Sequence, residues 1–216
     1  MSVFDLPSYV QNDYLGLMTQ QIEVSLGACA AGLGISLPIG QACARWRQAY
    51  PPVLVFVTVI YSIPSIALFV FLVAYTHLTE TTVFIPLVIY SLAILVPGVV
   101  DGIRAVPPEV RIAADAMGFG PARRYLQVEL PIATPTIMAA VRVAAVSSIS
   151  LMSVGGVLGN LGGFGNLFTQ GLRHFEIRLV WLGLFSLLAL ALVVDLALRA
   201  LQRLLTPWSA RRSVRA

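Results

Sequence analysis

The sequence contains no lysine, and charged residues of every kind are scarce. They make up 11% of the 216 residues, whereas hydrophobic residues make up 58%. A soluble domain usually carries about 25% charged and about 45–50% apolar residues, so this composition could not cover a water-facing surface. The net charge of +4 comes from arginines gathered in a few short stretches. That distribution is typical of membrane topology and argues against a surface that binds nucleic acid.

Cysteine and histidine are also rare, and each occurs twice. Cys29 and Cys43 lie in one apolar segment, at a separation along a helix that prevents a disulfide. His77 and His174 fall in different loops without further ligands at metal-binding spacing. The apolar segments also lack a Ser/His or paired-carboxylate arrangement suited to catalysis. We therefore expect no catalytic residue, metal site or cofactor. This disfavours an intramembrane enzyme, while an assembly scaffold that moves no solute stays open.

Five apolar windows are long enough to cross the hydrocarbon core of a bilayer, which takes about 20 residues of helix. In lipid the backbone groups of each window must be paired internally, so all five are expected to be helices, kinked but not broken at Pro38, Pro64, Pro86, Pro97 and Pro135. The sequence thus predicts an all-α membrane protein in the lipid bilayer, with residues 1–216 forming a single transmembrane domain. The windows are 21–44, 52–75, 82–100, 132–158 and 179–201.

Arginine placement predicts the orientation, because loops on the cytoplasmic side retain positive charge. Eleven arginines fall on one side of the five windows, two on the other, and Arg142 lies inside the fourth window. The N-terminus is therefore expected outside and the C-terminus in the cytoplasm. The eleven are Arg45, Arg47, Arg104, Arg111, Arg123, Arg124, Arg199, Arg203, Arg211, Arg212 and Arg215, and the two are Arg173 and Arg178.

The segment 105–131, between the third and fourth windows, is too polar to span and reads as two short helices separated by a turn. Pro107 and Pro108 suit a first helical turn, Glu109 opposes the positive end of the helix dipole, and Gly118 can supply a left-handed cap. A second short helix is expected to end before Leu130.

The first of these short helices has two predicted faces. Helical spacing puts four residues on one apolar face, which is narrow enough to enter a shallow groove. On another face Arg111 and Asp115 are expected to pair at i,i+4. The four apolar residues are Val110, Ala113, Ala114 and Met117.

This segment resembles the permeases of binding-protein-dependent ATP-binding-cassette (ABC) importers. Their signature is Glu-Ala-Ala, three residues, Gly, nine residues, Ile, one residue, Leu-Pro, and Ala113-Ala114, Gly118, Val128 and Leu130-Pro131 match it without a gap. Ile112 stands in place of the glutamate, which puts a salt bridge to the ATPase in doubt. The resemblance implies a type I importer permease fold, with a cytoplasmic coupling helix that seats on a separate ABC ATP-binding subunit. The residues it assigns to coupling are Glu109, Arg111, Ala113, Ala114, Gly118, Leu130 and Pro131.

Three further stretches are similar to the subgroup that carries glycine betaine, choline or carnitine: Ile63 to Leu68, Val128 to Pro131 and Leu161 to Leu167. The resemblance implies a bacterial or archaeal inner-membrane location, an extracytoplasmic solute-binding protein and a second permease chain, identical or paralogous. A permease for amino acids or another small solute remains an alternative. Gly155 to Gly171 is no P-loop, because it lacks the Gly-Lys-Ser/Thr ending. Its glycines predict tight turns and close helix approach.

Ionisable residues inside a membrane span are costly and need a partner or water. Arg142 is interpreted either as part of the translocation route or, preferably, as a structural tie to Asp101, Asp115 or Asp195. Asp195 in the fifth window also has Arg199 one turn later, and that i,i+4 pair would lower its cost. A structural role is expected for both.

Overall fold

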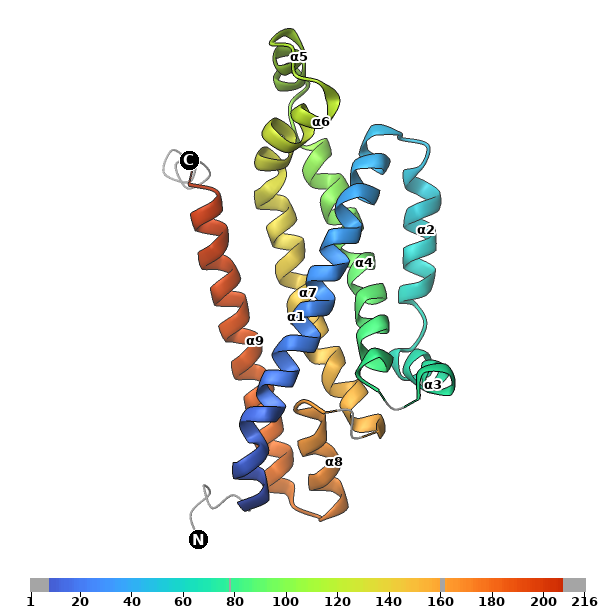
Figure 1. Cartoon of the computed structure of the whole chain (residues 1–216), viewed down its shortest axis with the longest axis vertical. Helices are drawn as coiled ribbons and strands as arrows, with labels where there is room; N and C mark the ends of the chain where they lie inside the picture. The colour runs from blue at the N-terminus through green and yellow to red at the C-terminus, as the bar shows by residue number, and fades with distance from the viewer. Residues whose placement is uncertain (1–7, 78, 160–161, 208–216) are drawn as a thin grey trace.

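The computed structural model describes residues 8–77, 79–159 and 162–207 and shows a bundle of helices that run along one long axis (Figure 1). Within these residues every regular element is a helix, which confirms the all-α prediction. The elements are α1 (Ser8–Arg45), α2 (Tyr50–Tyr61), α3 (Ser65–Thr76), α4 (Glu80–Arg104), α5 (Pro108–Ala116), α6 (Pro121–Arg124), the π-helix η1 (Tyr125–Glu129), α7 (Leu130–Gly159), α8 (Gly165–Arg173) and α9 (Ile177–Leu205).

Four stretches are long and apolar enough to cross a membrane: most of α1, all of α4, the continuous run from α6 through α7, and α9. The pair α2 and α3 makes a fifth candidate span, bent by 85° at a short break. Each of the five windows predicted from the sequence falls on one of these elements. The four to five candidate spans agree with the predicted membrane architecture.

The prediction of a kink at Pro64 was wrong, because the helix breaks there. Proline has no N–H to continue the helical ladder, and it pushes the preceding residue out of the helical region. Accordingly α2 ends at Tyr61 and α3 begins at Ser65, with Pro64 extended at ψ 128°. The carbonyl of Ile63, left without a helical donor, accepts a hydrogen bond of 2.7 Å from the hydroxyl of Tyr90 on α4.

The other four prolines lie inside unbroken helices, as expected. Pro38 is in α1, Pro86 and Pro97 are in α4, and Pro135 is in α7. Neighbouring helices and local adjustments can satisfy the backbone groups that a proline frees within a packed bundle.

The centre of the bundle is α4, which packs between α1 and α7. Small residues allow the close approach, as is common between membrane helices. A Cβ added to Gly40 of α1 would lie 2.4 Å from Val99 Cγ1 of α4, and one added to Gly98 of α4 would lie 2.3 Å from Ala140 Cβ of α7. The two glycines therefore lie directly against side chains of the facing helix at both crossings.

The two ends of the bundle differ. The 105–131 loop, the α1–α2 connection and the C-terminal end of α9 lie at one end, whereas α8 and the N-terminal end of α1 lie at the other (Figure 1). Helix α9 packs against α7 and α8 and leaves most of its apolar surface exposed. An exposed apolar face is what lipid or a second membrane chain would cover.

Candidate coupling loop and intramembrane ion pairs

The 105–131 loop projects beyond the end of α1 as two short helices joined by a tight turn (Figure 1). Pro108 lies in the first turn of α5 together with Glu109, as the sequence predicted. Gly118 has φ +79°, the left-handed conformation that glycine adopts without a steric penalty. The chain then restarts at Pro121 as α6. The turn chemistry read from the sequence is thus present in the structure.

The predicted apolar face of α5 does not lie on one side of the loop. Ala114 is turned inward and is 1% exposed, whereas Ala113 is exposed and Val110 is half-buried. Ile112 and Met117 are 68% and 69% exposed. The four residues therefore do not share one surface: Ala114 packs inside the loop, while Ala113 and Met117 face outward.

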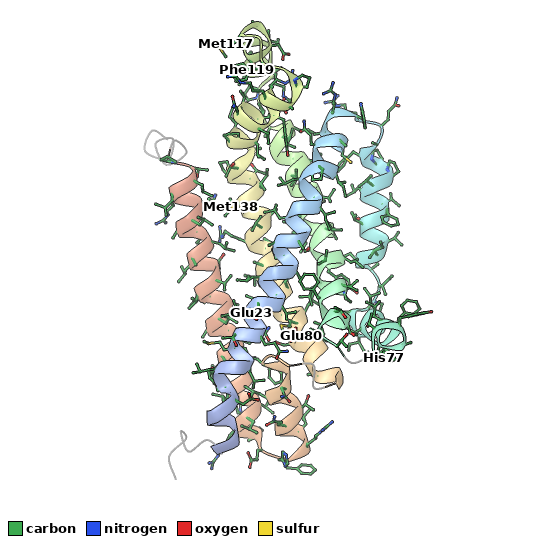
Figure 2. The ribbon with its side chains drawn as sticks, in the orientation of Figure 1. Glu23, His77, Glu80, Met117, Phe119 and Met138 are labelled. Carbon is green, nitrogen blue, oxygen red and sulfur yellow. The ribbon has the colours of Figure 1, made fainter. Side chains whose placement is uncertain are left out.

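The exposed apolar surface of α5 and its turn is made by three side chains, Ile112, Ala113 and Met117. Figure 2 shows Met117 at the tip of the molecule, with the half-buried Phe119 beside the same turn. Glu109 is exposed at the start of the same helix. These side chains form a small exposed apolar patch on an otherwise charged loop.

The expected pair between Arg111 and Asp115 does not form. Asp115 instead accepts two hydrogen bonds, of 2.6 and 2.7 Å, from Arg124 of α6. Arg111 turns toward the bundle, where it donates to the backbone carbonyl of Ile103 and lies 3.6 Å from Glu129. Exposed i,i+4 pairs are worth only a few tenths of a kcal/mol, so partners from other elements easily replace them.

The second short helix does not end before Leu130, as the sequence had predicted. It passes through η1 directly into α7, and the Leu130 N–H bonds to the Tyr125 carbonyl five residues earlier. A proline ring clashes with the carbonyl four residues before it, which for Pro131 is the carbonyl of Gln127. One wide turn relieves this clash, so α6, η1 and α7 form one continuous helix.

Three ionisable side chains cluster within the bundle, between α7 and α9. Arg142 Nε donates to Asp195 Oδ1 at 2.7 Å, and Arg199 Nε lies 2.8 Å from Asp195 Oδ2. Of the three acids considered for Arg142, the structure thus places Asp195 against it. The pair joins two helices that also meet through apolar side chains and through a hydrogen bond of 3.3 Å from Gln202 to the Pro135 carbonyl.

A polar cluster at the opposite end of the bundle was not predicted. Gln21, fully buried on α1, donates to the Ile149 carbonyl at 2.7 Å and accepts from the Phe164 N–H at 3.0 Å. Gln20 accepts from Gly163 and donates to Glu80 of α4. Two adjacent glutamines at the start of an apolar window could have indicated a buried polar contact. The local sequence does not identify their distant partners.

The glycines between α7 and α8 form the tight turn that the sequence predicted. Gly162 and Gly163 have φ of +91° and +63°. A Cβ on Gly156 would lie 2.5 Å from the Gly162 carbonyl oxygen, so the two segments touch through backbone. Leu161, part of the run compared with the osmoprotectant subgroup, lies outside the described residues. Short helix α8 follows this turn and was not predicted.

The described residues, 8–77, 79–159 and 162–207, contain no group of three or more His, Cys, Asp or Glu side chains that could hold a metal ion. Both cysteines are free and buried.

Residues 34–207 match the family described as "Binding-protein-dependent transport system inner membrane component". The chain is 34% identical to the osmoprotectant import permease protein OsmW of Salmonella typhimurium, over 92% of this chain and 94% of that protein. It is 27% identical to the choline transport system permease protein OpuBB of Bacillus subtilis, over 89% and 88%. It is 28% identical to the carnitine transport permease protein OpuCB of Listeria monocytogenes, over 90% and 88%.

The fold is similar to that of a chain in an inward-facing structure of the MetNI methionine ABC transporter. The TM-score is 0.82 at 20% sequence identity, over 93% of this chain and 100% of that chain. At that identity the likeness concerns the fold alone.

Proposed function

We propose that this chain, which belongs to the family of binding-protein-dependent transport system inner membrane components, imports quaternary-ammonium osmoprotectants as the permease subunit of an ABC importer. It is a transport subunit and not an enzyme, and its family implies a separate ATPase and a solute-binding protein. The observation that supports the substrate class is the 34% identity to an osmoprotectant import permease across nearly the whole length of both chains.

The mechanism we propose is alternating access driven by the partner ATPase. Closure of the ATPase would move α5, and the continuous helix from α6 through η1 to α7 would carry that movement into the membrane. A rigid element with two arrangements is what such coupling requires. Because α7 packs against α1, α4 and α9, its movement would reach three of the other candidate spans.

The contact with the ATPase is assigned to the exposed side chains of α5. Ile112 occupies the position of the family's glutamate and is 68% exposed, so docking there would bury apolar surface instead of forming a salt bridge. Ile112→Cys can be tested for cross-linking to the ATPase. The native Cys29 and Cys43 are buried, 4% and 2% exposed, and should give little background. Cross-linking equal to that of an exposed lipid-facing cysteine at Phe185 would contradict this contact.

The orientation we propose has the N-terminus outside and the 105–131 loop in the cytoplasm. Arg45, Arg104 and Arg124 belong to elements that end or lie near that loop, whereas Arg173 ends α8 at the opposite end (Figure 1). This asymmetry agrees with the positive-inside rule. Arg211, Arg212 and Arg215, counted on the same side, lie outside the described residues.

The orientation can be tested with a membrane-impermeant maleimide on intact spheroplasts. Leu172→Cys, 68% exposed on α8, should react without permeabilisation. Met117→Cys, equally exposed on the 105–131 loop, should react only after the membrane is opened. The reverse pattern would invert the topology and exclude Met117 from contact with a cytoplasmic ATPase.

The partner permease is proposed to be a second chain of the same fold, identical or paralogous. Helices α2, α3 and α9 have apolar side chains that the core of this chain leaves exposed. We expect part of this exposed surface to pack against the second chain. The mass of the complex purified through a tag on one permease copy, with an untagged copy co-expressed, separates a homodimer from a heterodimer. Recovery of only one permease chain per complex would contradict the pairing.

The substrate is tested by uptake of labelled glycine betaine in cells that lack their other osmoprotectant importers, with competition by unlabelled choline, carnitine and methionine. We expect uptake that requires this chain and is reduced by choline or carnitine. Uptake of methionine instead, with no effect of quaternary amines, would move the substrate to amino acids while keeping the permease.

A further inference from the structure

Four charged side chains connect the two short helices of the 105–131 loop to the base of α7. Arg124 of α6 bridges Asp115 of α5, at 2.6 Å, and Glu129 of η1, at 3.1 Å. Arg111 of α5 approaches the same oxygen of Glu129 at 3.6 Å and also donates to the Ile103 carbonyl at the end of α4. We call Arg111, Asp115, Arg124 and Glu129 the loop charge network.

The two acids of this network are in different surroundings. The Asp115 side chain is 53% exposed, whereas the Glu129 side chain is 5% exposed. Water screens an exposed pair, so its loss has little effect. A buried carboxylate depends on its partners, because an unpaired charge away from water is costly. Glu129 is therefore the acid that fixes the network, and Asp115 is an accessory.

Glu129 also occupies the mechanical junction of the loop. It is the last residue of η1, directly before Leu130 begins α7, and the two arginines reach it from α5 and α6. Besides this network, α5 is connected to the rest of the loop by the packing of the buried Ala114 and by the turn at Gly118, whose added Cβ would have nothing within 4 Å. A movement of α5 could be absorbed by that open turn unless charges hold α5 to the helix behind it.

From this geometry we infer that Glu129 is the positioning residue that ties the coupling helix α5 to the base of α7, so that ATPase closure moves the span. This inference rests on the proposed function. Glu129 is 4% exposed, so this role requires no contact between it and the solute or the ATPase. Its role is to keep α5, α6 and η1 as one rigid piece through Arg111 and Arg124.

The test uses Glu129→Gln, which keeps the shape of the side chain and removes its charge, in the complete complex of permeases, ATPase and binding protein in proteoliposomes. The number of solute molecules imported per ATP hydrolysed should fall by about tenfold, within the usual range of coupling between two sites. Basal ATP hydrolysis and the amount of ATPase that co-purifies should stay within about twofold. If Glu129 had a purely structural role, the yield of the complex, ATP hydrolysis and transport would all fall together. The number of solute molecules imported per ATP hydrolysed would then stay unchanged.

Asp115→Asn is the matched control, because it removes the exposed acid on the same arginine. We expect its import per ATP to remain within about twofold of the original chain. If Glu129→Gln also stays within that range, the inference is overturned.

Should Glu129→Gln fail to assemble, the double variant Arg124→Gln/Glu129→Gln removes the buried charge together with its nearest partner and should assemble. Coupling loss in that double variant supports the inference, and normal coupling overturns it. The original chain is measured in the same vesicles. If the original chain shows no ATP-driven import, the proposed function itself is refuted. If the original chain imports normally and Glu129→Gln imports as many solute molecules per ATP, only the role of Glu129 is refuted.

Discussion

Gly118→Ala should weaken the contact with the ATPase without affecting insertion into the membrane. Gly118 has φ +79°, and a side chain on an L-residue in this region costs about 1–2 kcal/mol. An added Cβ has nothing within 4 Å, so no clash adds to that cost. The loop would relax to another conformation and carry α5 away from its docking position.

The size of the effect follows from this strain. Since about 1.4 kcal/mol corresponds to a tenfold change in an equilibrium, the docking-competent population should fall about 5- to 30-fold. Gly120→Ala is the control in the same turn, because Gly120 has φ −66° and ψ 162°, which any residue adopts, and its added Cβ also meets nothing. The two variants therefore differ in backbone conformation and not in available space.

The assay is titration of the purified ATPase onto the permease in nanodiscs, together with solute uptake and the amount of permease in the membrane fraction. We expect ATPase affinity and uptake to fall for Gly118→Ala and to stay near the original for Gly120→Ala, with equal amounts of both in the membrane. Equal affinity and uptake for the two alanine variants would refute the reasoning from the left-handed turn.

Three further predictions concern packing and charge. Gly40→Ala should lower the melting temperature of the solubilised permease by roughly 2–8 °C, because the added methyl group overpacks against the facing valine of α4 at a cost of about 1–2 kcal/mol. Gly34→Ala is the control, because the space around Gly34 is open and its melting temperature should not change. Equal shifts for the two variants would contradict the close crossing of α1 and α4. Ala114→Leu should lower ATPase co-purification by disrupting the inside of the 105–131 loop, as limited proteolysis of that loop would reveal; unchanged cleavage would exclude this. Arg142→Gln and Asp195→Asn should each reduce thermal stability, and the double variant should lose less than their sum; additive losses would show that the pair is not coupled.

Much of the fold could be predicted because lipid imposes strong local rules. Apolar windows of sufficient length must be helices, so the spans could be located from hydropathy alone. Proline favours the first turn of a helix and glycine adopts the left-handed conformation without a steric penalty. Pro108 and Gly118 therefore predicted the short helix and its left-handed turn. Arg142 and Asp195 could be considered together because a charge in a span needs a partner.

The failures arise where tertiary contacts decide the outcome. Pro64 breaks its helix while Pro86 does not, and at the break the Ile63 carbonyl accepts a hydrogen bond from Tyr90 of another helix. Arg111 has an acid at i+4, yet it turns to Glu129, eighteen positions away in sequence. Neither choice is visible in the local sequence, because the competing partners come from other elements.

The binding partners of the buried Gln21 show the same limit. Its amide contacts residues 128 and 143 positions away, which no local pattern connects to α1. The outward direction of Ile112 and the inward direction of Ala114 also depend on how α5 lies on its own loop. Which residues of α5 are buried and which are exposed could therefore be learned only from the structure.

The most direct test of the account is the accumulation of labelled glycine betaine in proteoliposomes that contain this permease, its ATPase and its binding protein. The account predicts accumulation that requires ATP inside the vesicles and the binding protein outside them, and that is lost when the permease is omitted. A complex that assembles and hydrolyses ATP but accumulates neither glycine betaine, choline nor carnitine would contradict the proposed substrate class, and accumulation that is independent of ATP would contradict the importer mechanism.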